Sequence, residues 1–222
     1  MKKSAFTMIE LVMVIVVLGI LAALAMPRME RDLRQEAGDD ILSAIRYTQH
    51  LALMDNKTDP TDPNWQREYW QIRFAQYRKD GRTRFFYTIS TNLNQNNDAG
   101  ANTNTNVDKN ETTIDPANGK YMYHRAGDAV ETRADESSNI FIGKNYGVDA
   151  IDFAGGCVGI QHIAFDHMGR PHVGIYDSTN TFDSYMNPDC SITFGFEGDN
   201  MTLVIDISRE TGYAQIRAQN NS

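Results

Sequence analysis

The sequence predicts an α+β protein in which one long N-terminal helix packs against an antiparallel β-sheet. The first quarter of the chain carries apolar side chains at helical spacing, beginning with an apolar run from Ala5 to Met26. Later stretches alternate between apolar and polar residues, as half-buried strands do, and turn sequences separate them. With 222 residues, the chain is long enough for one head domain after the helix.

The apolar run is long enough to cross a bilayer. Ala5 to Met26 comprises 22 residues, which as a helix would extend about 33 Å against a hydrocarbon core of about 30 Å. Lys2 and Lys3 precede it, so the positive-inside tendency keeps the N-terminus cytoplasmic and sends the rest outward. The alternative is an ordinary secreted soluble protein, because Ala23-Leu24-Ala25 fits a signal-peptidase pattern that would leave Met26 first.

Glu10 is the only charged residue in this run. A charge in the middle of a span costs about 2.5 to 3.5 kcal/mol on insertion scales, and intramembrane charges normally have both a partner and a function. A carboxylate would also disrupt the hydrophobic core of a cleaved signal peptide. We therefore expect Glu10 to have a cationic partner.

Residues Lys2 to Leu11 resemble the class III signal of type IV pilins and type II secretion pseudopilins. The resemblance implies that a prepilin peptidase cuts between Ala5 and Phe6, where the family usually has glycine before the cut. It implies that the new N-terminus is methylated and that Glu10 becomes the fifth residue of the mature chain. It also implies the partner of Glu10, because in filaments of this family the glutamate neutralises the N-terminal amine of a neighbouring subunit, here that of Phe6.

The same resemblance implies an organisation and a location. Residues 1–5 are a leader peptide, 6–27 are the transmembrane and filament-core half of the helix, and 28–222 comprise its amphipathic half and a β-rich head. The subunit is a single-pass inner-membrane protein with a periplasmic head until it joins a pilus or pseudopilus. Its partners are other pilin or pseudopilin subunits, the prepilin peptidase, the inner membrane and the secretion or pilus assembly machinery.

The helical pattern continues past Pro27, where many pilins carry a helix-kinking proline. Proline inside such a pattern predicts a kink rather than an end. Apolar residues recur at steps of three and four from Met29 to Ala52, and charged residues occupy other positions. The loop sequence from Asp55 to Pro63 follows, so the helix should end near Met54.

Alternating runs predict the strands. Trp70 to Ala75 and Phe85 to Ile89 flank the turn Asp80-Gly81 and predict an antiparallel hairpin. In the last third, further runs predict strands of one antiparallel sheet around residues 163–165, 173–175, 192–196, 201–207 and 213–217. Short candidates at 121–124 and 140–142 cannot be placed in a sheet from sequence.

Two other stretches add to this interpretation. Residues 92–110 are rich in Asn, Thr and Asp and predict a mobile surface loop. Residues 164–170 and 203–212 resemble the C-terminal pattern of the pseudopilin H and FimT group of minor pilin-like proteins. That likeness implies a minor subunit.

The predicted head is acidic and contains both cysteines of the chain. From Arg28 onward there are 19 basic and 28 acidic residues, a net charge of −9, so the head should not attract DNA or anionic lipid non-specifically. Cys157 and Cys190 are the only cysteines. In an oxidising compartment they can form one disulfide, which would contribute on the order of 3 to 4 kcal/mol. Two unconnected buried thiols are the alternative.

A DNA-binding uptake pilin is the alternative function. Residues 65–87 alternate arginines with aromatic residues, and a hairpin of this kind can contact phosphates and stack on bases. The candidate residues are Arg73, Arg82 and Arg84, and some FimT-like minor pilins take up DNA. We favour the opposite interpretation, in which aromatic residues fill the core and arginines line the solvent face or pair with the acidic surface.

We expect neither catalysis nor a metal site. No nucleophile, base and orienting group stand at recognisable spacing, and there is no phosphate-binding glycine loop. His162, His167 and His172, with Asp166 among them, lack a close-spaced ligand pair, so we expect them to face solvent around a hairpin.

No cofactor is predicted, and calcium is the alternative that we considered. Asp98, Asp108 and Asp115 offer oxygen ligands, but they lack the ordered twelve-residue loop of a calcium site.

Overall fold

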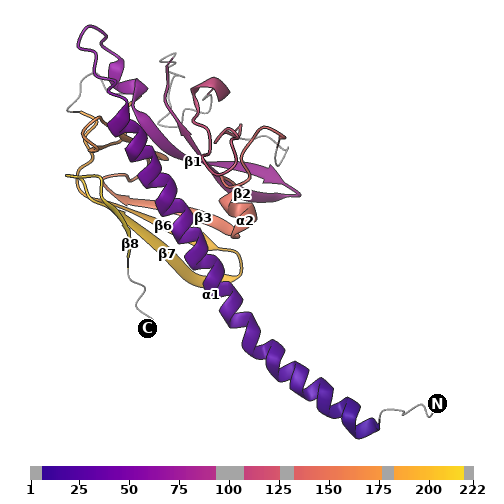
Figure 1. Ribbon diagram of the computed structural model, residues 1–222. Coiled ribbons are helices and arrows are strands. Elements are labelled where there is room, and N and C mark those ends of the chain that lie inside the picture. Colours follow the sequence, from indigo (N-terminus) through magenta and orange to yellow (C-terminus); the bar gives the residue numbers. More distant parts are fainter. Residues whose placement is uncertain (1–6, 94–107, 126–132, 177–182, 218–222) are drawn as a thin grey trace.

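The computed structural model describes residues 7–93, 108–125, 133–176 and 183–217, and within these it describes the backbone alone for 22–32 and 199–201. The chain forms a long helix, α1 (Met8–Met54), whose C-terminal half packs on two antiparallel sheets and whose N-terminal part projects away from them (Figure 1). This arrangement confirms the predicted α+β class. The head contains two sheets, however, where the sequence predicted one.

Helix α1 ends where the sequence predicts, at Met54. The residues that face the head are buried at helical spacing, and they are Ala37, Ile41, Ala44, Ile45, Thr48 and Ala52. Gly38 allows a close approach to the second sheet, because a Cβ there would lie 3.0 Å from Cδ1 of Ile216 and 3.1 Å from Cδ1 of Leu203. The amphipathic half of the helix therefore serves as one wall of the core.

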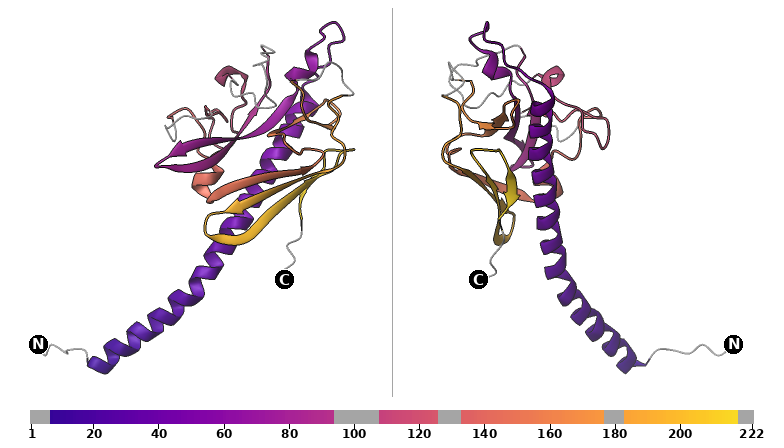
Figure 2. Two further views of the ribbon diagram at one scale, coloured as in Figure 1. Left: turned by 180° about the vertical axis from the view of Figure 1, so that it is seen from behind. Right: turned by 60° about the vertical axis from the view of Figure 1, so that its left-hand side comes forward.

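Helix α1 runs through Pro27 without a break. The sequence predicted that the helix would not end there, and it does not. Figure 2 shows the helix curving along the part that leaves the head. A kink centred on Pro27 stays a prediction.

The first sheet has the strand order β2-β1-β4-β5. Its strands are β1 (Trp70–Lys79), β2 (Arg82–Ser90), β4 (His162–Phe165) and β5 (Pro171–His172). The predicted hairpin is confirmed, since β1 and β2 pair antiparallel around Asp80 and Gly81. Both turn residues have positive φ, as a two-residue hairpin turn of this kind requires. The strand predicted around 173–175 is wrong in its extent, because β5 ends at His172.

The second sheet has the order β3-β6-β7-β8. Its strands are β3 (Val148–Gly155), β6 (Cys190–Phe196), β7 (Asp199–Ile207) and β8 (Ala214–Ile216). The last three were predicted, and the structure confirms them. Strand β3 was missed, because it is an exposed edge strand in which Asp149 and Asp152 interrupt the apolar alternation.

The β1–β2 hairpin is enclosed on both faces. On one face Phe74 meets Phe194 of the second sheet, with ring centroids 5.6 Å apart. On the other, Tyr77 meets Phe141 at 5.7 Å, immediately before the short helix α2 (Ile142–Asn145). The candidate segment 140–142 therefore leads into a helix, and its apolar side chains cover the face that we expected to be open to solvent.

Two short 3₁₀ helices complete the described structure. They are η1 (Trp65–Glu68), which precedes β1, and η2 (Lys109–Glu111), which follows β2. Most of the predicted mobile loop at 92–110 lies outside the described residues.

Cys157 and Cys190 form a disulfide that joins the turn after β3 to the first residue of β6. Both residues are completely buried. The bond therefore ties an edge strand, which has few buried side chains, to a central strand of the second sheet.

Replacing both cysteines with alanine should lower the free energy of unfolding by about 3 to 4 kcal/mol, because the unfolded chain regains the freedom of the closed loop. Urea unfolding of the full-length chain in a mild detergent measures this difference. A reductant should lower the free energy of unfolding of the wild type to that of the Cys157→Ala/Cys190→Ala variant, and it should not change the value of the variant. Equal stability of the oxidised wild type and the variant would contradict the prediction.

Candidate functional site

The side chains of residues 8–21 form an exposed apolar arm. Each large apolar side chain in this arm is at least 49% exposed, and Met8 near its tip is 89% exposed. A helix that is apolar on all sides is normally buried, either in lipid or in a larger protein core. The arm thus presents a surface that is unfavourable in water. Within the described ranges, no helix has both the length and the apolar character needed to cross a membrane.

Glu10 is the one charged side chain of the arm, and it caps α1. Its Oε2 accepts hydrogen bonds from the backbone N–H and from the hydroxyl of Thr7, both at 3.0 Å. The backbone N–H of Glu10 donates to Oγ1 of Thr7 at 3.4 Å. This reciprocal capping box satisfies groups that have no partner within the helix. Ala5 and Phe6, the predicted processing residues, lie outside the described residues.

Thr7 is a site residue that our sequence reasoning missed. A threonine followed three residues later by a glutamate is the pattern of a capping box, so the local sequence contained the signal. Because Thr7 is the second residue after the predicted cleavage site, it holds the Glu10 carboxylate at the end of the helix where the new N-terminus is expected.

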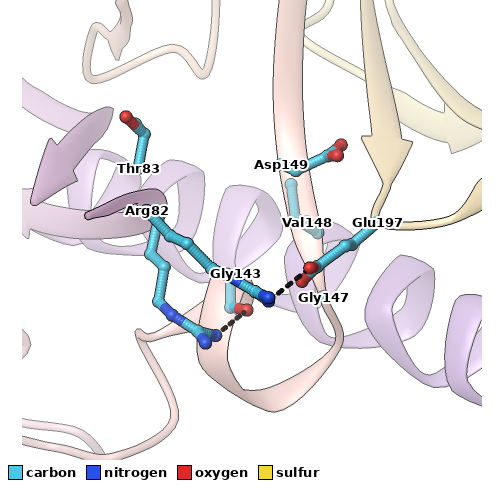
Figure 3. Close-up of a pocket in the computed structure, with 8 residues that line it drawn as sticks. Arg82, Thr83, Gly143, Gly147, Val148, Asp149 and Glu197 are labelled. Carbon is cyan, nitrogen blue, oxygen red and sulfur yellow. Dashed lines mark hydrogen bonds and ion pairs between the residues drawn. The ribbon is translucent and has the colours of Figure 1, made fainter. Parts of the chain in front are cut away.

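Arg82 and Arg84, two of the DNA-binding candidates, line a cleft of about 330 Å³ at the end of the β1–β2 hairpin (Figure 3). Arg82 forms an ion pair with Glu197, and Nη1 of Arg84 donates to the carbonyl oxygen of Gly143 at 3.1 Å. Asp149 also lines the cleft. Two guanidinium groups therefore share the cleft with two carboxylates, so it is not a uniformly cationic surface.

Arg73, the third candidate, lies away from that cleft and is only 4% exposed. It is paired in β1 with Thr88 of β2 and with His162 of β4. The expectation that this arginine lines the solvent face is wrong, because both faces of the hairpin are covered. A nucleic-acid role needs an accessible guanidinium, and the position of Arg73 does not support one.

The expectation of solvent-facing histidines is also wrong for His162 and His172, which are completely buried. Nδ1 of His172 lies 2.7 Å from Oγ of Ser184, and Nε2 lies 3.4 Å from Oδ2 of Asp166. Burial lowers the pKa of His172, although the contact with Asp166 opposes this shift. Among the described residues, no three His, Cys, Asp or Glu side chains are grouped so as to hold a metal ion.

The aspartates considered for calcium make other contacts. Asp108 caps η2, and Asp98 lies outside the described residues. The Asp115 carboxylate accepts hydrogen bonds from four groups: the side chains of Asn118, Ser137 and Asn139 and the backbone N–H of Ala117. Such a carboxylate stabilises the loop around it, and calcium binding stays an untested prediction.

Comparison with known proteins identifies the start of the chain. Residues 1–26 match the family model of the prokaryotic N-terminal methylation motif, the signal of type IV pilins and pseudopilins. With the helix and sheets described above, the motif supports a type IV pilin-like or pseudopilin protein, which is a structural class of protein. The motif implies in general processing by a prepilin peptidase, membrane anchoring and assembly with other pilin subunits. No curated protein and no solved structure matches the chain.

Asp40 is an unusual carboxylate on the part of α1 that packs on the head. It lines a cleft of about 290 Å³ with Tyr47, Tyr87 and Asp115. Its Oδ2 is buried and has no hydrogen-bond partner among the described residues. Burial, then the charge of Asp115 and that of Glu36, raises the pKa of Asp40 to about 6. Folding is thus more favourable when this group is protonated.

Asp40→Asn should therefore stabilise the protein at pH 7 and have little effect at pH 4. The pKa of Asp40 is higher in the folded than in the unfolded state, so its contribution to stability is present at low pH and is lost as the pH rises through about 6. We expect a gain of about 1 to 3 kcal/mol at pH 7, measured by urea unfolding between pH 4 and 7. Asp39→Asn, which changes the exposed neighbouring carboxylate, is the matched control. A stability change in Asp40→Asn that does not depend on pH would contradict the prediction.

Proposed function

We propose that this protein is a structural subunit of a type IV pilus or type II secretion pseudopilus, and that it is a minor subunit. The observation that carries the proposal is the exposed apolar arm with Glu10 capping its end, which lies within the N-terminal methylation motif at residues 1–26. The assignment to a minor subunit rests on the likeness of residues 164–170 and 203–212 to the pseudopilin H and FimT group.

The proposed assembly begins with processing in the inner membrane. The prepilin peptidase cuts between Ala5 and Phe6, and the new amine of Phe6 is methylated. Until assembly, the arm is covered by lipid and the head faces the periplasm. Burying a large apolar side chain contributes about 1.5 to 3 kcal/mol. The arm is therefore much more stable when lipid or neighbouring arms cover it than when it is exposed to water.

In the filament, the arms of neighbouring subunits replace the lipid. Glu10 then pairs with the Phe6 amine of a neighbour, since either charge alone would be costly in an apolar core. Apolar packing has little directional preference, whereas an ion pair favours one alignment of the two helices. Glu10 thus selects the register in which subunits pack.

The two alternatives have less support from the geometry. A DNA-binding uptake pilin would use the hairpin arginines, but Arg73 is buried and Arg82 is already paired with a carboxylate. A freely secreted protein cut after Ala25 would lose the arm together with Glu10, which leaves the capping box without a role.

The mature N-terminus distinguishes filament subunit from secreted protein. We expect mass spectrometry of the chain from its native host to find an N-terminal peptide that begins with methylated Phe6. The measurement does not depend on whether filaments are recovered. A chain that begins at Met26 would exclude a pilin-type subunit.

Glu10→Ala should leave the subunit in the membrane but reduce its incorporation into filaments by more than about a hundredfold. The physical reason is that breaking a buried ion pair costs about 3 to 5 kcal/mol, and each 1.4 kcal/mol corresponds to a factor of ten. Sheared filament and membrane fractions are compared by immunoblot. Glu36→Ala, which removes an exposed carboxylate from the same helix, should assemble normally. Normal incorporation of Glu10→Ala would refute the pairing role.

A further inference from the structure

The outer face of the first sheet carries a buried polar patch. It consists of side chains from three neighbouring strands, namely Gln71, Arg73, Thr88, Ser90 and His162, and none of them is more than 4% exposed. Arg73 pairs with Thr88 and with His162, while Gln71 pairs with Ser90. Since side chains alternate along a strand and paired residues share a face, all five lie on one side of the sheet.

The patch contains buried polar atoms without a hydrogen-bond partner in the described structure. They include Oε1 of Gln71, Nε of Arg73 and Oγ of Ser90. The other polar atom of Gln71, Nε2, donates to the hydroxyl of Tyr176, which places that hydroxyl at the edge of the patch. Buried polar groups in folded proteins normally have a hydrogen-bond partner, and leaving one unsatisfied costs more free energy than a typical hydrogen bond contributes.

Arg73 is the feature that calls for a ligand of a particular charge. Three other arginines in the described part of the chain have carboxylate partners: Arg82 with Glu197, Arg170 with Asp166 and Arg217 with Asp206. No ion pair involves Arg73 among the described residues. Burial lowers its pKa, yet a guanidinium stays charged in proteins. A buried cation of this kind needs an anion beside it.

The neighbouring atoms define the chemistry of that anion. A guanidinium presents a planar fork of donors that matches a carboxylate. The Ser90 hydroxyl can donate to the same anion, whereas Oε1 of Gln71 can only accept and so requires a donor on the ligand. A carboxylate with a hydroxyl or N–H group on the adjacent carbon would satisfy all three atoms.

We propose that the patch around Arg73, Gln71 and Ser90 is an internal binding site for a small carboxylate that carries a hydrogen-bond donor next to it, such as a 2-hydroxy acid or an amino acid. The carboxylate binds the Arg73 guanidinium and the Ser90 hydroxyl, and the adjacent donor bonds to Oε1 of Gln71. The site is enclosed, so the ligand exchanges slowly and becomes part of the folded head. This inference does not depend on the assembly of filaments.

The test uses the full-length chain in a nonionic detergent, dialysed into chloride buffer at pH 7 and then equilibrated with sodium chloride, acetate or glycolate at equal ionic strength. Acetate supplies a carboxylate alone, and glycolate adds a hydroxyl. At about five times the dissociation constant, a bound anion should raise the midpoint of thermal unfolding by about 2 to 4 °C. We expect acetate to raise the midpoint above that in chloride, and glycolate to do so at a lower concentration.

The variants assign the effect to the site. Arg73→Met should lose the response to both anions, and the matched control Arg82→Met, which changes an exposed arginine of the same hairpin, should keep it. If Arg73→Met does not fold, Gln71→Met serves instead, and it should keep the acetate response while losing the advantage of glycolate. Equal wild-type midpoints in all three salts would overturn the proposal. An undiminished response of Arg73→Met to the two anions would also overturn it, as would an undiminished advantage of glycolate over acetate in Gln71→Met.

Discussion

The organisation of this molecule depends on the fact that α1 contacts the head along only part of its length. From Ala37 to Ala52 the helix has one buried apolar stripe and an exposed polar side, as a helix on a globular protein should. From residue 8 to 21 it is apolar all round and has nothing packed on it within the described structure. The two parts require different surroundings, so a chain with this helix is stable only where an apolar phase and water lie next to each other.

The head provides a rigid base for that helix. Its hairpin is covered by the second sheet on one face and by the segment around Phe141 on the other, while α1 approaches the second sheet closely at Gly38. The disulfide adds a covalent tie within the second sheet. The side chains of each layer pack against those of the next, and α1 continues from the arm into the head without a break. A force applied to the arm is therefore transmitted to the head through α1 and not through a flexible linker.

Much of this fold could be predicted because its signals are local. The spacing of apolar residues gives α1 and its end at Met54, and Asp80-Gly81 gives the hairpin. The capping box of Thr7 and Glu10 is equally local and could have been found. The burial of Arg73 and His162 could not, because it depends on which distant segments cover the sheet. Strand β3 was missed for a similar reason, since it is held by pairing with β6 and not by its own composition.

The capping box has a consequence for how folding and association are connected. All hydrogen bonds that the structure gives to the Glu10 carboxylate involve Oε2, and they come from Thr7. Within the described residues Oε1 accepts none, so the same carboxylate has a second oxygen that can accept a donor from another chain. Bonding to an incoming amine would then not require the helix end to fray, and the two sets of bonds would add to each other instead of competing. The helix end is ordered before a partner arrives, so less conformational entropy is lost on docking.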